Sequence, residues 1–225
     1  MKKADVIEFY ARLAQDNPHP VTELESGNAF QLLVAVVLSA QSTDAGVNRA
    51  TRQLFAEVET PEQMVALGED ALKRHIKTIG LFNTKAKNVV ALSRALIAEH
   101  GGQVPANRDA LERLPGVGRK TANVVMNTAF GAETFAVDTH IFRVGNRTGL
   151  ARGKTVLAVE KALDKATPQP FRLHAHHWLI LHGRYVCKAR TPECWRCIVV
   201  DLCAFKPKTP EPVSARRPAT SSAKA

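Results

Sequence analysis

Short stretches with the hydrophobic spacing of a helix alternate along this chain with tight turns. In residues 5–16 the apolar side chains recur three and four positions apart, at Val6, Phe9 and Leu13, which places them on one face of a helix. Residues 29–40 are nearly all apolar, a pattern typical of a helix buried on every side. No run alternates regularly enough to predict a strand, so we predict an all-α fold.

Turn residues divide the rest of the chain into further predicted helices. Thr60 before Pro61 is a typical helix start, with threonine as the cap and proline in the first turn. Gly101-Gly102 is a typical helix end. The remaining stretches with helical spacing cover residues 43–58, 69–76, 85–100, 109–113 and 121–130.

The composition also favours helices over a sandwich of strands. Of the 225 residues, 45% are hydrophobic but only 6% are aromatic, so the core must be built largely from leucine, valine, alanine and isoleucine. A chain of this length can bury a core of its own.

The charge balance points to a polyanionic partner. The formal net charge is +10. Residues 206–225, which we predict to be a disordered basic tail, carry about +4 of this charge and are rich in proline, serine and alanine. The remaining body is still strongly basic, as is typical of proteins that bind nucleic acids.

Neither a membrane segment nor a secretory signal is predicted. The longest apolar stretch, residues 30–38, is too short to cross a bilayer, and the N-terminal residues become amphipathic after two lysines. We therefore expect a cytoplasmic protein, in which disulfides are rare.

The most informative central stretch is Leu-Pro-Gly-Val-Gly-Arg-Lys-Thr-Ala at residues 114–122. Gly116 and Gly118 permit backbone conformations closed to other residues and let a phosphate approach backbone N–H groups beside a helix N-terminus. Arg119 adds a positive charge. A plain glycine turn between helices is the alternative, but the hydrophobe-Pro-Gly-hydrophobe-Gly order predicts a DNA-binding helix-hairpin-helix motif at about residues 108–130.

Two residues near this hairpin are candidates for catalysis. Lys120 lies in the first turn of the second predicted helix, where the positive end of the helix dipole disfavours its charged form. An uncharged amine can act as a nucleophile, although Lys120 could instead bind a phosphate. Asp138 precedes another helical stretch and could cap it, or it could stabilise a cationic sugar or accept a proton from an amine.

The only cysteines form a C-x6-C-x2-C-x5-C pattern near the C-terminus: Cys187, Cys194, Cys197 and Cys203. Four thiolates so close together predict a metal centre in an intracellular protein. Spacing alone leaves both zinc and an iron–sulfur cluster open. Lys188 and Arg190 lie in the loop between the first two cysteines, where we expect them to face DNA phosphates.

Taken together, these motifs resemble the endonuclease III family of the helix-hairpin-helix DNA glycosylase superfamily. The resemblance extends over almost the whole chain to about residue 206. It is carried by the hairpin and the cysteine spacing together with Leu-Ser-Ala-Gln-Ser-Thr-Asp at residues 38–44, Gly-Leu-Phe-Asn-Thr-Lys-Ala at 80–86, Val-Asp-Thr-His-Ile-Phe-Arg-Val at 137–144 and His-His-Trp-Leu-Ile-Leu-His-Gly-Arg at 176–184.

The resemblance implies a two-lobed all-α fold with a DNA cleft between the lobes. A six-helix domain would cover residues 21–131. Residues 1–20 and 132–205 would form the second domain, in which the four cysteines hold a [4Fe–4S] cluster. It also implies a monomer associated with the nucleoid.

The same resemblance implies base excision repair of oxidised or ring-damaged pyrimidines in double-stranded DNA, and strand cleavage at abasic sites. Lys120 matches the family's nucleophile and Asp138 its catalytic carboxylate. Gln41 and Leu81 match the residues that fill the gap left by the extruded nucleotide.

Two alternatives are less consistent with the residues. The related adenine glycosylase that acts opposite oxidised guanine differs at the lysine position and has a further C-terminal domain. A DNA-binding module without catalysis would require neither Lys120 nor Asp138.

Overall fold

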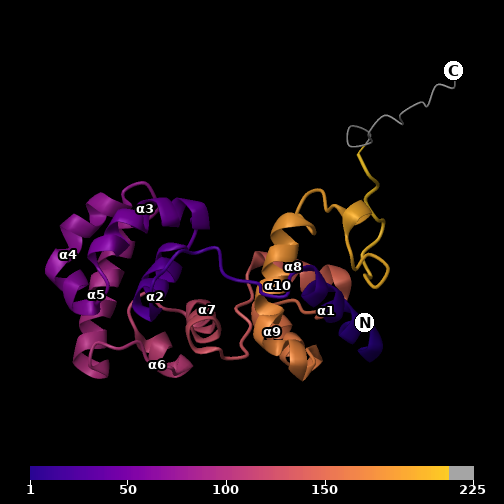
Figure 1. Cartoon of the computed structure of the whole chain (residues 1–225), viewed down its shortest axis with the longest axis horizontal. Helices are drawn as coiled ribbons and strands as arrows, with labels where there is room; N and C mark the ends of the chain where they lie inside the picture. Colours follow the sequence, from indigo (N-terminus) through magenta and orange to yellow (C-terminus); the bar gives the residue numbers. More distant parts are fainter. Residues whose placement is uncertain (213–225) are drawn as a thin grey trace, which may run out of the picture. The chain divides into compact units, whose positions relative to one another are not determined.

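The computed structural model describes residues 1–212 and shows a helical protein (Figure 1). These residues form ten α-helices and two short 3-10 helices, with no strand, which confirms the predicted all-α fold. Most of the predicted basic tail, residues 213–225, lies outside the described residues. Among those described, no helix is both long and apolar enough to cross a bilayer.

The contacts divide the chain into two compact units. The six-helix unit comprises residues 20–136 and 172–176. The cysteine unit comprises residues 1–19, 137–171 and those from 177 onward. Each unit has its own buried residues and is described by itself.

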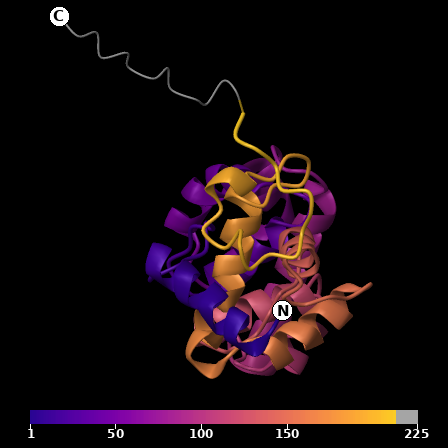
Figure 2. The ribbon, with the colours of Figure 1, turned by 90° about the vertical axis from the view of Figure 1, so that its right-hand side faces the viewer.

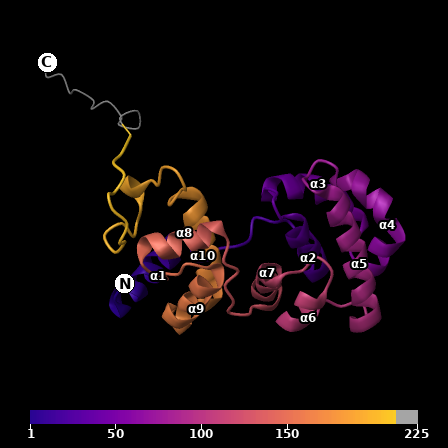
Figure 3. The same cartoon turned by 180° about the vertical axis from the view of Figure 1, so that it is seen from behind.

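The six-helix unit is built around one central apolar helix. Its elements are α2 (Ala29–Leu38), α3 (Asp44–Glu57), α4 (Pro61–Ile76), α5 (Phe82–His100), α6 (Arg108–Arg113) and α7 (Arg119–Phe130). Every residue of α2 after Ala29 is buried, and α2 packs against α3, α5 and α7 (Figure 3). The buried Gln31 satisfies its amide by donating to the carbonyl oxygens of Phe55 at 2.8 Å and Val58 at 2.9 Å.

The start predicted at Thr60 is confirmed. The Thr60 side chain accepts from the N–H of Gln63, whose side chain accepts from the N–H of Thr60 at 3.1 Å, and Pro61 opens the helix. This pair satisfies backbone donors that have no partner within the helix. Gly68, with φ of +77°, interrupts α4, so the helix consists of two stretches, as the sequence pattern predicts.

The cysteine unit contains α1 (Lys3–Asp16), α8 (Thr139–Thr148), α9 (Val156–Ala166) and most of α10 (Arg172–Tyr185), with 3-10 turns at Gln169–Phe171 and Cys194–Arg196. The predicted apolar face of α1, including Phe9 and Leu13, is buried. The Arg12 guanidinium lies 2.7 Å from the Asp201 carboxylate, which fastens α1 to the segment that carries the cysteines.

Candidate functional site

The hairpin between α6 and α7 is anchored by two apolar side chains. Leu114 and Val117 are buried in the core of the six-helix unit, and the N–H of Val117 donates to the carbonyl of Leu114 at 3.1 Å. The tight turn therefore has a fixed shape, while Gly116 and Gly118 between and after these anchors are exposed.

The two hairpin glycines are required for different reasons. Gly116 has φ of +77°, and a Cβ there would lie 2.9 Å from the Cβ of Asn88, so the fold itself demands glycine. Gly118 has an ordinary φ of −99° as the N-cap of α7, and a Cβ there would meet nothing within 4 Å. The open space at Gly118 lies beside the first N–H groups of α7, which have no partner within the helix. An anion can reach these donors.

Lys120 is the second residue of α7 and is exposed. Its amine makes no hydrogen bond or ion pair with any other residue among 1–212. The preceding Arg119 lies 3.9 Å from the Glu112 carboxylate. Of the two neighbouring cations, Lys120 is therefore the one whose side chain is available for another molecule.

Asp138 caps α8 and keeps one oxygen available. Its Oδ1 accepts from the N–H of His140 at 2.9 Å and the N–H of Ile141 at 2.8 Å. Its Oδ2 has no partner within the described part of the chain. Asp138 is therefore the N-cap of α8, as the sequence allowed. The cap uses only Oδ1 and fixes the orientation of the carboxylate, so Oδ2 remains available.

Hydrogen bonds from α7 hold the segment that leads to Asp138. The Asn123 side chain donates from Nδ2 to the carbonyl of Phe135 at 3.0 Å, and the main-chain carbonyl of Asn123 accepts from Thr134 Oγ1 at 2.7 Å. Asn127 donates to the carbonyl of Ala132 at 2.8 Å. Both asparagines are buried. Sequence reasoning missed them, although two asparagines four residues apart on an apolar helix are a detectable signal.

Lys120 and Asp138 belong to different compact units. The contacts of Lys120 and those of Asp138 are therefore described separately, each within its own unit. The chain leaves the six-helix unit at Ala136, two residues before the carboxylate. Ala136 is itself held by its N–H, which donates to His176 Nδ1 at 3.3 Å.

Gln41 and Leu81, predicted to fill the gap in DNA, share an unusual backbone. Their φ angles are +55° and +58°, and no other non-glycine residue among 1–212 has a positive φ. This conformation costs roughly 1–2 kcal/mol in a residue with a side chain. Leu81 is also 59% exposed. Strain of this kind concentrates at functional sites.

The loops that carry Gln41 and Leu81 lie side by side. A Cβ on Gly80 would be 4.0 Å from the carbonyl oxygen of Gln41. Lys85 on α5 donates from Nζ to Ser42 Oγ at 2.9 Å and so ties the two loops together. Lys85 is only 5% exposed, and burial lowers its pKa. Sequence reasoning did not single out this lysine.

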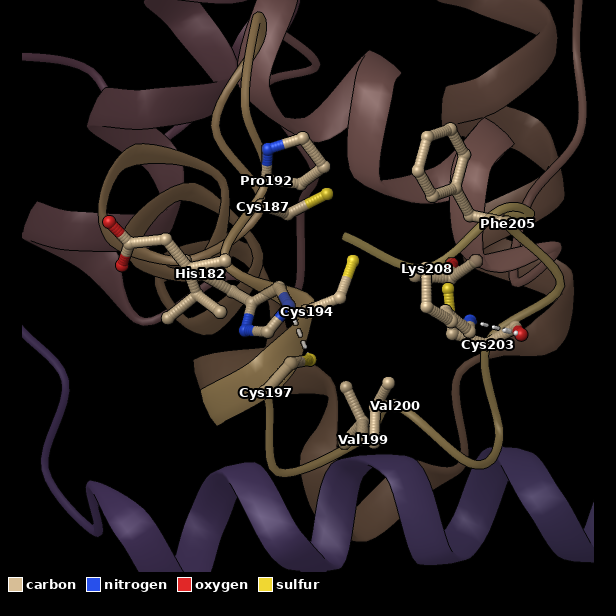
Figure 4. A pocket seen from close by; sticks show the side chains of 13 residues that line it. His182, Cys187, Pro192, Cys194, Cys197, Val199, Val200, Cys203, Phe205 and Lys208 are labelled. Carbon is tan, nitrogen blue, oxygen red and sulfur yellow. Dashed lines mark hydrogen bonds between the residues drawn. The ribbon is translucent and has the colours of Figure 1, made fainter. Parts of the chain in front are cut away.

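The four cysteines line one pocket in the cysteine unit. Figure 4 shows their side chains around a common space beside Val199 and Phe205. The segment leaves the end of α10 and winds back beside that helix, as the orange and yellow ribbon of Figure 2 shows. The pKa of the Cys197 thiol is raised to about 11, mainly by burial and to a smaller extent by the other three cysteines. Thiols in such a setting become thiolates readily only with a bound cation, so the donor set fits a metal centre.

Two arginines from α8 support this pocket. Arg143 donates from Nε to the carbonyl of Cys187 at 2.9 Å. Arg147 donates to the carbonyls of Lys188 and Ala189, each at 2.7 Å, and its NH1 lies 3.8 Å from Cys187 Sγ. These contacts fix the start of the loop between the first two cysteines and place positive charge next to sulfur.

The two basic residues of that loop differ in their surroundings. Lys188 Nζ lies 2.6 Å from the Glu193 carboxylate, so its charge is partly neutralised within the loop. Arg190 is exposed and makes no hydrogen bond or ion pair within residues 1–212. Arg190 is therefore the better placed of the two for a phosphate.

Comparison with known proteins identifies the family. Residues 34–169 match the HhH-GPD superfamily of base excision DNA repair proteins. The chain is 59% identical to endonuclease III of Haemophilus influenzae, over 92% of this chain and 99% of that protein. The chain belongs to the endonuclease III family. It is also 56% identical to endonuclease III of Escherichia coli K12 with the same coverage.

Solved structures of this family support the same conclusion. A trapped endonuclease III–DNA covalent intermediate matches with a TM-score of 0.84 and 45% identity, over 90% of this chain and 96% of that one. A non-covalent endonuclease III–DNA complex gives the same TM-score and identity. The fold and the repair function implied by the sequence motifs are thereby confirmed.

The cofactor also follows from the family. Endonuclease III relatives at this level of identity carry a [4Fe–4S] cluster, and the four C-terminal cysteines are present in this chain. The prediction of a [4Fe–4S] cluster is therefore confirmed, and the zinc alternative is not supported.

Proposed function

We propose that Lys120 and Asp138 act together on one damaged pyrimidine nucleotide, in a protein that both removes the base and cuts the strand. The same site would cut at existing abasic sites. The observation that carries this proposal is the exposed Lys120 amine, without a partner in residues 1–212 and two residues after the open Gly118. A DNA phosphate bound at the hairpin would bring deoxyribose close to this amine.

The damaged nucleotide must first leave the stack, because a base inside a duplex is shielded. Gln41 and Leu81 are suited to fill the gap, since both lie on adjacent loops in a strained backbone conformation. Both side chains are exposed. The exposed side chain of Leu81 offers apolar surface to the neighbouring bases.

The Lys120 amine and the Asp138 carboxylate then remove the base together. The lone pair of Lys120 Nζ forms a bond to C1′ as the bond from C1′ to the base breaks, and the base leaves with that electron pair and takes up a proton. Asp138 stabilises the positive charge on the sugar through Oδ2 and accepts the proton released by the attached amine. Its Oδ1 stays in place at the N-terminus of α8.

Strand cleavage uses the bond already formed. The sugar ring opens as the C1′–O4′ bond breaks with its electrons on O4′, which takes up the proton held by Asp138, and the nitrogen lone pair forms the C=N bond. The resulting protonated imine between Lys120 and C1′ makes the hydrogens on C2′ acidic. Loss of one of these protons forms a double bond between C2′ and C3′, and the C3′–O bond breaks with its electrons on the departing phosphate. Water then hydrolyses the imine and restores Lys120.

The two compact units would each contribute to DNA binding. The protein would act as a monomer in the cytoplasm, associated with the nucleoid. The cluster held by the four cysteines would make their segment rigid. Arg147 fixes the loop from Cys187 to Ala189, so Arg190 has a defined place from which to bind a phosphate. Lys188 and Arg119 would add charge to the same surface.

Trapping with borohydride tests this proposal, because reduction of the imine leaves the protein covalently attached to DNA. The intact protein should form this adduct on a duplex with one oxidised pyrimidine, and Lys120→Ala should form none. Lys161→Ala, which removes an exposed lysine on α9, is the matched control and should form the adduct normally. Base removal without any adduct would indicate a glycosylase without lyase activity, and binding without base removal would indicate a non-catalytic module. Either result would refute the proposal.

A further inference from the structure

A second basic site lies on the six-helix unit, between α3 and α4. An open hollow of about 350 Å³ is lined by Arg49, Ala50 and Gln53 of α3 and by Arg74 and His75 of α4. These helices pack against each other and are drawn side by side in Figures 1 and 3. No carboxylate lines the hollow, which we call the α3–α4 pocket.

The charges of the α3–α4 pocket are not neutralised within the described residues. Arg49 and Arg74 are both exposed, and neither makes an ion pair or hydrogen bond with another residue among 1–212. Two neighbouring cations on the same helices, by contrast, each lie next to a carboxylate. Arg52 lies 3.7 Å from the Glu25 carboxylate, and Lys73 lies 2.7 Å from the Glu69 carboxylate. Two arginines that converge on one hollow without an acidic partner form a site for an anion.

The α3–α4 pocket lies close to the loops that carry Gln41 and Leu81. Arg49 lies five residues after the start of α3, which corresponds to about 7.5 Å along the helix at 1.5 Å per residue. Arg74 lies two residues before the end of α4. The loops that carry Gln41 and Leu81 adjoin these same helix ends. The pocket therefore lies near the ends of α3 and α4 from which these two loops extend.

We infer that the α3–α4 pocket binds a backbone phosphate of the duplex, next to the base step that Gln41 and Leu81 open. This inference rests on the proposed binding of DNA by the loops. The guanidinium groups of Arg49 and Arg74 would each donate to phosphate oxygens, and His75 would add a further donor. Holding the backbone here keeps the strand in place while the neighbouring step is opened.

The salt dependence of DNA binding tests the inference. Affinity for an undamaged duplex is measured by fluorescence anisotropy between 50 and 300 mM salt for the intact protein and the double variant Arg49→Gln/Arg74→Gln. Loss of one phosphate contact should lower the slope of log K against log salt by about 0.9 and weaken binding roughly eightfold at 0.1 M salt. Arg49→Lys/Arg74→Lys keeps the charge and should restore most of the slope. Arg52→Gln removes an arginine of α3 outside the pocket and should leave the slope unchanged.

An unchanged slope and affinity in the double glutamine variant would overturn the inference. So would an equal effect of Arg52→Gln, because the contribution would then be general charge. Inorganic phosphate is titrated into the free protein at constant ionic strength, with the His75 ring observed by NMR. Saturable binding there, combined with unchanged DNA binding, would assign the pocket to a free anion and overturn the assignment to DNA. Borohydride trapping by the intact protein reports separately on the proposed function, so failure of one is distinguishable from failure of the other.

Discussion

Asn123 on α7 donates from its buried Nδ2 to the carbonyl of Phe135 at 3.0 Å. This bond joins the helix that begins with the hairpin to the extended segment that precedes Asp138. Thr134 Oγ1 donates in turn to the main-chain carbonyl of Asn123. The helix that carries Lys120 therefore holds Phe135, near the end of the six-helix unit and three residues before Asp138 in the chain.

Replacing Asn123 with alanine should affect both stability and catalysis. Loss of a buried hydrogen bond lowers the free energy of unfolding by about 1–3 kcal/mol, which urea denaturation measures. Base removal in a single turnover should also slow, because the segment before Asp138 is less well fixed. Asn127→Ala, which removes contacts farther along the chain from Asp138, is the control and should cost stability with less effect on the rate. Equal loss of rate in both variants would argue against a positioning role for Asn123.

Alanine at the two hairpin glycines should affect different properties, mainly stability at Gly116 and mainly DNA binding at Gly118. Gly116→Ala should lower the free energy of unfolding by about 1–3 kcal/mol, because the positive φ is strained and the new Cβ would meet Asn88. Gly118→Ala should cost at most about 1 kcal/mol of stability, because alanine is a poorer N-cap than glycine. It should nevertheless weaken DNA binding several-fold, since its Cβ would occupy the space of the phosphate. Unfolding curves and anisotropy on the same samples separate the two effects. Normal DNA affinity in Gly118→Ala would exclude close approach of a phosphate there.

Asp138 has two oxygens with separable roles. Asp138→Asn keeps a side-chain acceptor for the α8 cap, so stability should remain nearly unchanged. Base removal should slow about 100-fold, as expected when a charged group that stabilises a cationic transition state is lost. Asp138→Ala should also lose about 1 kcal/mol of stability with the cap. If Asp138→Asn removed bases at the normal rate, the carboxylate would be a cap and nothing more.

Lys85→Met tests whether the buried lysine has a positioning role. Burial of the ammonium group disfavours its charged form, so methionine should preserve or raise the melting temperature. The Ser42 loop would lose its tie to α5, and opening of the base stack should slow. A fluorescent base analogue opposite the lesion measures this step. Slow opening with retained stability supports positioning of the loop. A lower melting temperature with normal opening would show that Lys85 only supports the fold.

Local patterns were sufficient to predict much of the fold. The capping pair at Thr60 and the break before residue 69 depend on residues close together in the chain, as do the hairpin and the possible cap at Asp138. Each of these features is determined by contacts within about one helical turn, and periodicity and turn chemistry report such contacts directly.

The features that the sequence did not predict depend on partners far along the chain. Lys85 meets Ser42 across 43 residues, and Arg147 meets the loop at Lys188 across 41 residues. The left-handed backbone at Gln41 and Leu81 is likewise not predicted by local propensity, because neither residue type favours it. Such contacts arise only when the helices pack together, and no local pattern encodes them.

The central claim, that Lys120 is the nucleophile, is tested most directly by locating the trapped DNA on the chain. After borohydride reduction and digestion with protease and nuclease, tandem mass spectrometry identifies the amine that carries the deoxyribose remnant. The account predicts the added mass on Lys120 in the peptide that follows the glycine hairpin. The same mass on the N-terminal amine or on any other lysine, with Lys120 unmodified, would contradict it.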